Sequence, residues 1–288
     1  IVAANTLDVV AVAIDASGLT GTGDFTLVHT SDLLSGSSVK GTANLDTIAI
    51  GTTNGTTYET FGGNDVFTGL LAALVATGED DNVIKAGAGT ADQITLADTT
   101  LTLTDNHFTN MTGMEILTGT STSGAFTVTT GTAFNTAFAG GATITTGRIA
   151  DGVAASVNFQ AGLATMDVTF TVDATLMVGN AAGEDSTIVT GSGADTITFT
   201  GDGTYVGAAA DAGTISVSSG AGIDTISVTV GTILAQTNSQ SVIINAGTGA
   251  DVITLVGVAA DTVQSTALVV IDAGDSLTTA RDKLTGAD

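Results

Sequence analysis

The chain has 288 residues, of which 43% are hydrophobic, and this content excludes an extended, disordered polyanion. Its 29 Asp and Glu residues stand against only five Lys and Arg, which gives a formal net charge of -24. This charge repels nucleic acid and anionic membrane surfaces and attracts multivalent cations, so we expect neither nucleic-acid binding nor membrane insertion.

The composition also predicts the class of secondary structure. The sequence has no Cys, Pro or Trp, but it has 38 Gly. Disulfides and thiolate metal sites are therefore excluded, and the many Thr, Val and Ile predict short strands joined by tight glycine turns. No apolar run reaches the roughly 18 to 20 residues of a membrane span.

Residues 1–104 carry three loose copies of one pattern, in which an aspartate precedes alternating apolar residues. The stretches "TANLDTIAI", "FGGNDVF" and "GAGTADQITL" contain Asp46, Asp65 and Asp92, each two residues before Ile or Phe. We predict that 1–104 form an N-terminal solenoid block. The stretch from "FGGNDVF" to "LLAALVA" contains a plausible helical turn.

Residues 105–182 lack this corner but keep a strand-like alternation, as in "AFTVTT" and "MDVTFTVD". Two interpretations stay open for this middle block. It either continues the solenoid without corners or forms a small β-rich insertion.

Residues 183–288 repeat the corner regularly, and we predict a regular solenoid block here. The first glycines of the copies are Gly191, Gly220, Gly247 and Gly274, so the corner recurs with a period of about 27 residues. The aspartate of the corner follows four residues later, at Asp195, Asp224 and Asp251. A further plausible helical turn lies in "TILAQTNSQ". The last repeat is incomplete, so we expect this chain to be a segment of a longer, processed protein.

Apolar residues flank each corner at fixed distances. One set lies three residues before the first glycine: Ile188, Val217, Ile244 and Ile271. The other set lies two residues after the aspartate: Ile197, Ile226 and Ile253. Alternation on both arms of a glycine bend predicts two strands with one face inward. We therefore predict an all-β, right-handed parallel β-solenoid with rungs of about 27 residues, whose two sets form two buried stacks.

Stacking brings the corner carboxylates together. Two carboxylates about 5 Å apart repel by roughly 3 kcal/mol at an effective dielectric near 20. One interpretation is calcium held between rungs by carboxylates and glycine carbonyls, with the glycines adopting positive φ. Its ligands would be Asp46, Asp65, Asp92, Asp195, Asp224 and Asp251, with Gly191, Gly193, Gly220, Gly222, Gly247 and Gly249. The alternative is that each Asp only accepts hydrogen bonds from its own turn, although neutral Asn would do this without repulsion.

The corners resemble the Gly-Gly-x-Gly-x-Asp-x-hydrophobic nonapeptides of RTX proteins, whose second half they match residue for residue in 183–288. The stretch "NHFTNMTGMEILTGT" at 106–120 also resembles a segment of RTX-type bacterial S-layer proteins and large surface adhesins. The resemblance implies calcium binding, secretion and surface display. RTX toxins repeat the nonapeptide in uninterrupted runs, whereas this chain has one corner in each long repeat, so each rung would offer one metal corner.

Other chemistries fit the sequence less well. A dinucleotide-binding loop would open a helix, but a Thr-Ile-Thr strand follows these glycines, and the Gly-Lys-Ser/Thr of a P-loop is missing. The two histidines, His29 and His107, lie in unlike surroundings, and the acidic pair Glu79 and Asp80 lacks the aromatic platforms of sugar-cleaving sites. Threonine alternations such as "TITFTG" are typical of a solvated strand face, with ice or glycan binding as the alternative. We expect no enzyme activity.

The resemblance, together with these patterns, implies a structural protein of the bacterial cell surface, located outside the cell. In this hypothesis a calcium-stabilised solenoid assembles into an S-layer or a similar array, with copies of itself and cell-surface polysaccharide as partners. The alternative is an adhesin, or a spacer module of a secreted RTX enzyme.

Overall fold

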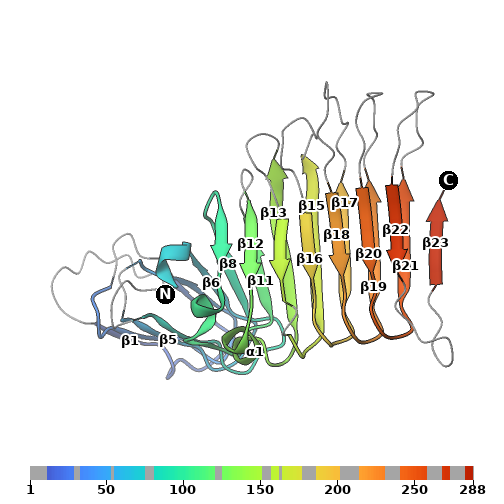
Figure 1. The fold of residues 1–288 in the computed structure, drawn as a ribbon. Coiled ribbons are helices and arrows are strands. Elements are labelled where there is room, and N and C mark those ends of the chain that lie inside the picture. The colour runs from blue at the N-terminus through green and yellow to red at the C-terminus, as the bar shows by residue number, and fades with distance from the viewer. Residues whose placement is uncertain are drawn as a thin grey trace. The chain divides into compact units, whose positions relative to one another are not determined.

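The structure is a computed structural model. It describes residues 12–28, 33–52, 55–74, 81–120, 125–150, 157–161, 164–176, 186–201, 214–230, 241–257, 268–272 and 283–287. All strand pairs with a defined register are parallel, as the sequence predicted for a β-solenoid (Figure 1). The chain divides into two compact units.

The first unit comprises Ile1–Asp98, Leu103–Gly119 and Thr132–Ala142. One of its sheets has the order β1-β3-β5-β7-β10, and its second run of strands has the order β2-β4-β6-β8-β11. The strands are β1 Ala13–Asp15, β2 Phe25–Leu27, β3 Ser38–Lys40, β4 Asp46–Ala49, β5 Thr57–Glu59, β6 Val66–Gly69, β7 Val83–Lys85, β8 Gln93–Leu96, β10 Met111–Thr112 and β11 Ile116–Gly119. Up to β8 the odd-numbered strands lie in one wall and the even-numbered strands in the other, and β10 and β11 then extend these two walls, which is the winding of a solenoid.

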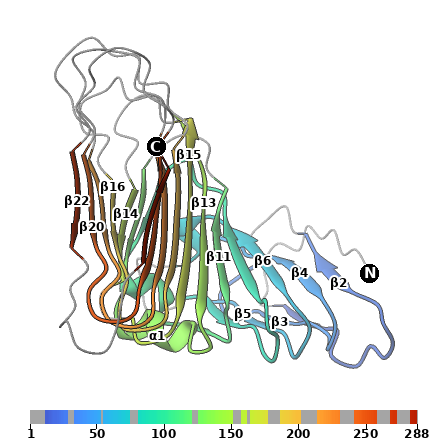
Figure 2. The same ribbon diagram turned by 90° about the vertical axis from the view of Figure 1, so that its right-hand side faces the viewer.

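The second unit comprises Thr99–Thr102, Thr120–Gly131 and Thr143–Asp288. Its two walls are the runs β9-β12-β14-β16-β18-β20-β22 and β13-β15-β17-β19-β21-β23, which lie on either side of the stack in Figure 2. The strands are β9 Leu101–Leu103, β12 Phe126–Thr129, β13 Ala142–Ala150, β14 Val157–Gln160, β15 Val168–Leu176, β16 Ser186–Val189, β17 Thr196–Gly201, β18 Thr214–Ser218, β19 Thr225–Val230, β20 Ser241–Asn245, β21 Val252–Gly257, β22 Leu268–Asp272 and β23 Lys283–Ala287.

In the second unit, residues paired between neighbouring strands are separated in sequence by the period that the sequence pattern predicted. Thr196 pairs with Thr225, and Thr225 pairs with Val252, so each partner lies one sequence repeat after the last. The first unit winds less evenly, because the partners of Val66 are Thr47 on one side and Gln93, which is more distant in sequence, on the other. Rung length therefore varies while the register of the strands is kept.

The two predicted apolar stacks are confirmed. On one wall of the second unit, Ile188 pairs with Val217 and Val217 with Ile244, and all three are buried. The register continues to Ile271, whose side chain lies outside the described part. On the other wall the row is Ile197, Ile226 and Ile253, which are at most 1% exposed. Further inward rows, such as Phe199 with Val228 and Ile215 with Val242, are buried beside them, and the inward rows together carry the hydrophobic stabilisation.

Short helices lie between the described strands of the first unit: η1 Leu71–Ala73, η2 Asp105–Phe108 and α1 Thr132–Ala137. The helical turn predicted around "LLAALVA" is η1, whereas "TILAQTNSQ" lies outside the described residues. Helix α1 packs on η2 through Phe108, Phe134 and Phe138, whose ring centroids are 4.7 to 5.9 Å apart.

The middle block continues the winding of the solenoid. In the first unit, β10 and β11 extend its two walls by pairing with β7 and β8. In the second unit, β12 pairs with β14 on one wall and β15 pairs with β17 on the other, in the same parallel way. Of the two interpretations left open by the sequence, these pairings favour continued rungs, with α1 as a short addition.

Candidate functional site

The six predicted corner aspartates begin, or directly precede, strands of one wall in each unit. The structure brings them together in two sets of three, each at most 1% exposed. The first unit holds Asp46, Asp65 and Asp92, and the second unit holds Asp195, Asp224 and Asp251. Each set forms a ladder along its own stack of rungs.

In the second unit each aspartate is linked to the next through the main chain. The N–H of Asp195 donates a hydrogen bond to Oδ1 of Asp224, and the N–H of Asp224 donates one to Oδ1 of Asp251, both at 2.9 Å. The N–H of Val168 donates to Oδ1 of Asp195 at 2.8 Å, because an apolar residue takes the corner position in that rung. The carboxylate of one rung therefore satisfies the main chain of the rung before it.

The first unit repeats this arrangement and ends it with a different acid. The N–H groups of Asp46 and Asp65 donate to Oδ1 of Asp65 and Asp92, respectively, both at 2.7 Å. The N–H of Asp92 donates to Oε2 of Glu115 at 2.8 Å. Sequence reasoning missed Glu115 as a member of the ladder, although "MEILTG" also places an apolar residue, Leu117, two positions after the acid.

Hydroxyl side chains form a second ladder next to the aspartates. Thr60, Thr190 and Ser219 each lie five residues before a corner Asp and are buried. Their hydroxyls donate to the carbonyls of Ala86, Ser219 and Ala246 in the following rung, at 2.6, 3.0 and 2.8 Å. Sequence analysis missed these contacts, and the repeated Thr or Ser before the corner was the available signal.

Asp46 also shows the local bonding that the alternative interpretation expects. Its Oδ2 accepts a hydrogen bond from the N–H of Thr42 at 2.7 Å, and its Oδ1 accepts one from the Thr42 hydroxyl at 2.9 Å. Both carboxylate oxygens of Asp46 are thus occupied within its own turn, in addition to the contact from Phe25 N–H at 3.2 Å.

The corner glycines stack as tightly as the aspartates. Positive φ angles occur at Gly220, Gly222, Gly247 and Gly249. A Cβ at Gly222 would collide with the carbonyl oxygen of Gly193, so no larger residue fits between these rungs. The carbonyls of Gly191 and Gly220 accept hydrogen bonds from Ala221 and Thr248 at 3.0 and 2.9 Å. Each of these carbonyls thus accepts a bond along the stack, and their predicted role as cation ligands stays a prediction.

The second carboxylate oxygen has a different environment in most corners. The Oδ2 atoms of Asp65, Asp92, Asp195 and Asp224 are buried and have no hydrogen-bond partner. Burial, as the largest cause, raises the pKa of Asp65 and of Asp92 to about 6. Burial likewise raises the pKa of Asp195 and of Asp224. The neighbouring hydroxyls of Thr60, Thr190 and Ser219 act against this rise in the pKa of Asp65, Asp195 and Asp224, but the effect of burial is larger.

The fit of calcium to these corners is partial. Each orphaned Oδ2 offers one hard oxygen ligand, which suits calcium. Calcium takes about six to eight oxygens, however, and within the described ranges no group of three or more His, Cys, Asp or Glu side chains is arranged for a metal. The remaining oxygen ligands would have to be main-chain carbonyls of the nearest rungs and water molecules. Calcium binding therefore stays a prediction.

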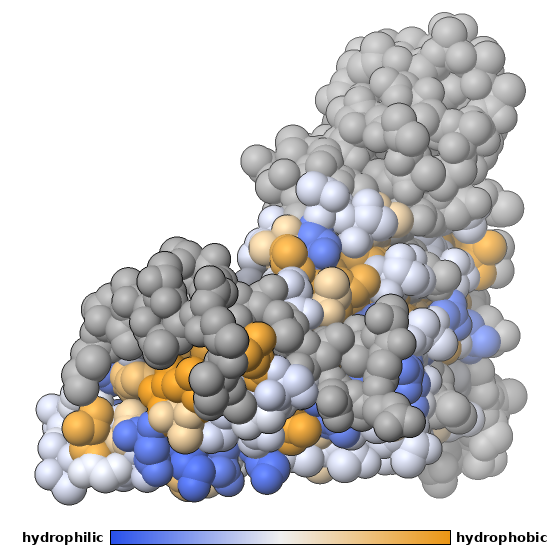
Figure 3. All heavy atoms as spheres, turned by 90° about the vertical axis from the view of Figure 1, so that its left-hand side faces the viewer, coloured by the Kyte–Doolittle hydropathy of each residue, from blue (hydrophilic) through white to orange (hydrophobic). Residues whose placement is uncertain are grey.

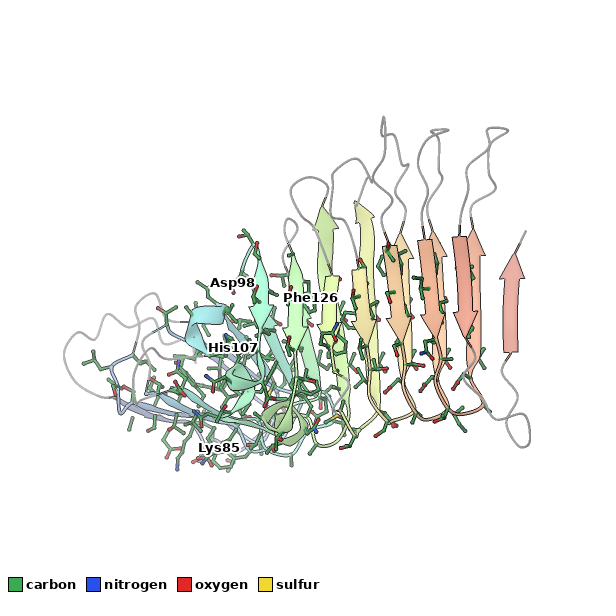
Figure 4. The ribbon with its side chains drawn as sticks, in the orientation of Figure 1. Lys85, Asp98, His107 and Phe126 are labelled. Atoms are coloured by element: carbon green, nitrogen blue, oxygen red, sulfur yellow. The ribbon has the colours of Figure 1, made fainter. Side chains whose placement is uncertain are left out.

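The other candidates from the sequence do not form a site in the part that the structure describes. His107 lies half-buried on η2, where its Nδ1 accepts the N–H of Thr104 at 3.0 Å, and burial lowers its pKa (Figure 4). His29 and the pair Glu79 and Asp80 lie outside the described residues. Among the described helices, none has both the length and the apolar character needed to cross a membrane.

Comparisons with known protein families, with curated proteins and with solved structures find no match to this chain.

Proposed function

We propose that the chain is a structural protein of the bacterial cell surface, a stack of rungs that assembles into an S-layer or a similar extracellular array. The observation that carries this proposal is that the buried aspartates bond to neighbouring rungs. Six aspartates, which in an enzyme would line a cleft, lie buried in two ladders that tie one rung to the next. Their arrangement serves the stack and leaves none of the six open to a substrate.

Calcium is the second part of the proposal. The support comes from the four orphaned Oδ2 atoms and from the net charge of -24, both of which a divalent cation would offset. Asp65, Asp92, Asp195 and Asp224 would supply the carboxylate ligands. Since an ion that binds only the folded state stabilises it, folding would be completed outside the cell, where calcium is plentiful.

Electron microscopy of the purified chain tests the array, with calcium and with a chelator in parallel. We expect ordered sheets or filaments with calcium and dispersed particles without it. Dispersed monomers under both conditions would contradict the array and favour a spacer in an adhesin or a secreted enzyme.

Calorimetric titration with calcium tests the ion separately from assembly. Asp224→Asn should weaken calcium binding, because it removes a buried carboxylate with a free oxygen. The matched control is Asp167→Asn, since Asp167 is exposed and lies outside the ladder, with its Oδ1 accepting the Ala194 N–H at 2.8 Å. Equal calcium binding by wild type and Asp224→Asn would overturn the corner site.

A further inference from the structure

One face of the second unit is formed by the outward side chains of β17, β19 and β21. Strand register places them in three rows of three, one residue from each strand. The rows are Thr196, Thr225 and Val252; Thr198, Ser227 and Thr254; and Thr200, Thr229 and Val256. We call these nine side chains the threonine face.

The threonine face is uniform in shape. Eight of its nine residues are Thr or Val, whose branched side chains have nearly the same volume and outline, and Ser227 is the single smaller residue. The outward rows of β16, β18 and β20 on the opposite wall mix unequal side chains, such as Ser216 beside Thr187 and Ile243. The threonine face therefore presents even ridges and grooves, and the opposite wall does not.

The nine side chains are also uncharged, although the chain carries 29 acidic residues, and charged residues enter these rows only on the flanking strands, at Asp173 on β15 and Lys283 on β23. A sheet in the first unit shows the contrast, because one of its outward rows runs through Asp15, Lys40, Glu59 and Lys85. Exposed hydrophobic side chains such as Leu45 and Phe61 also occur in the first unit, and Figure 3 shows hydrophobic and hydrophilic side chains intermixed on one side of the molecule.

The spacing of the rows restricts what can bind to them. Rungs are about 4.8 Å apart, and outward side chains on one strand are about 6.7 Å apart. A partner that fills every groove must have the same two repeats. A second copy of this chain has them by construction, so the branched side chains of one face fit the grooves of the other.

Charge points to the same partner. Two molecules with a net charge of -24 repel each other, and this repulsion is smallest where the contacting surfaces hold no charge. We propose that the threonine face packs against the same face of a second copy and forms one contact of the array. This inference rests on the proposed function, in that it takes self-assembly to be the role of the stack.

Sedimentation velocity of the full chain over a hundredfold range of concentration tests the contact. Ser227→Lys places a charge at the centre of the face, and we expect it to raise the dissociation constant of the dimer by about a hundredfold or more. The matched control is Ser216→Lys, at the centre of the opposite wall, which should leave the dissociation constant unchanged. Thr198→Val should also leave it unchanged, because the two side chains have the same outline.

Each outcome decides between defined alternatives. If the dimer persists in Ser227→Lys, the proposed contact through the threonine face is wrong, while the proposed array is unaffected. The same holds if Ser216→Lys weakens the dimer as much as Ser227→Lys does. With calcium present, monomers of the wild type at every concentration overturn both the threonine face and the array. Retention of a monomeric wild type on insoluble polysaccharide, lost in Ser227→Lys, would assign the face to a glycan surface. Circular dichroism and melting confirm folding first, and Thr198→Lys replaces Ser227→Lys if that variant does not fold.

Discussion

A single corner aspartate has two oxygens in different situations. Oδ1 of Asp224 accepts a main-chain N–H from the neighbouring rung, whereas Oδ2 is buried without a partner. An amide in the same place would keep the first contact and remove the charge. Residue-level variants can therefore separate the mechanical role of the carboxylate from its role in binding a cation.

Asp224→Asn should have opposite effects in chelator and in calcium. In chelator it should leave the melting temperature unchanged or raise it, because Asn retains an acceptor for the Asp195 N–H and removes a buried charge. In calcium the variant should be less stable than the wild type, because it loses a ligand. Asp224→Ala is the control and should be less stable by about 1 to 3 kcal/mol in both conditions, since it leaves that N–H without an acceptor.

Acidification should stabilise the calcium-free protein. The pKa values of Asp65 and Asp92 are raised by burial from 3.8 to about 6, so between these values the folded state binds more protons than the unfolded state. This contribution is therefore largest below the unfolded pKa and declines as pH rises through about 6. Urea unfolding in chelator at about pH 7.5 and about pH 4.5 should show the higher midpoint at the lower pH. The double variant Asp65→Asn, Asp92→Asn should show a smaller rise, and an equal rise would assign it to other groups.

The positions of the six aspartates were predictable, but their hydrogen-bond partners were not. The corner pattern fixes where each Asp lies in its rung, and stacking follows from the period. Whether Oδ1 meets an N–H or a cation depends on the path of the main chain in the neighbouring rung, which lies 19 to 29 residues away in sequence. Glu115 was missed for a different reason, because a longer acid fills the same place and only the second corner glycine, Gly113, precedes it.

At the scale of strands, the inward rows determine stability. Ile226 is fully buried between Ile197 and Ile253, so truncation leaves a cavity that two neighbouring rungs line. The strands that carry these rows are short, which makes each buried side chain a large share of the local packing.

Ile226→Ala should lower the free energy of unfolding by about 2 to 5 kcal/mol. Ile243→Ala is the matched control, because Ile243 lies on a strand of the opposite wall and is 39% exposed. Its effect should be below about 1 kcal/mol. Chemical unfolding of the two variants provides the measurement, and similar losses would mean that the inward row is not the core.

Gly222→Ala should destabilise the corner by more than about 1 to 3 kcal/mol, because φ is +145° and the new Cβ would meet the carbonyl of Gly193. Gly140→Ala is the control, since the nearest atom to its Cβ would be Glu115 Oε1 at 4.0 Å. Thermal melting compares the two. A Gly222→Ala protein as stable as the control would show that the glycine stack is not needed for the rung spacing.

Helix α1 marks the limit of prediction at this scale. It has only six residues, and the N–H groups of Ala133 and Phe134 donate to the carboxylate of Asp105 at 3.1 and 2.9 Å. The capping residue is distant from the helix in sequence, so no local sequence pattern predicts the helix. Strands were predictable because their alternation is local, whereas the helix depends on tertiary contacts.

For each unit as a whole, the fold class followed from the period and the alternation. Regular rungs in 183–288 fix the register of the strands, since a shift by one residue would expose every buried Ile. Rungs in the first unit vary in length, with corner acids 19, 27 and 23 residues apart, and the sequence pattern was correspondingly weaker there. The function was harder to predict than the fold, because the pattern of buried and stacked residues specifies the solenoid but not what binds to it.

The direction of the hydrogen bonds in the second unit has a mechanical consequence. The bonds between paired strands, and those of the aspartate ladder, join each rung to the next along the stack. A force that pulls the ends of the stack apart therefore loads the interfaces between successive rungs in series, and rungs detach one after another. Each detached rung releases about 90 to 100 Å of extended chain, at roughly 3.3 to 3.6 Å for each of its residues. Such a stack yields to tension in steps and absorbs work at each one, so it lengthens under load before it comes apart.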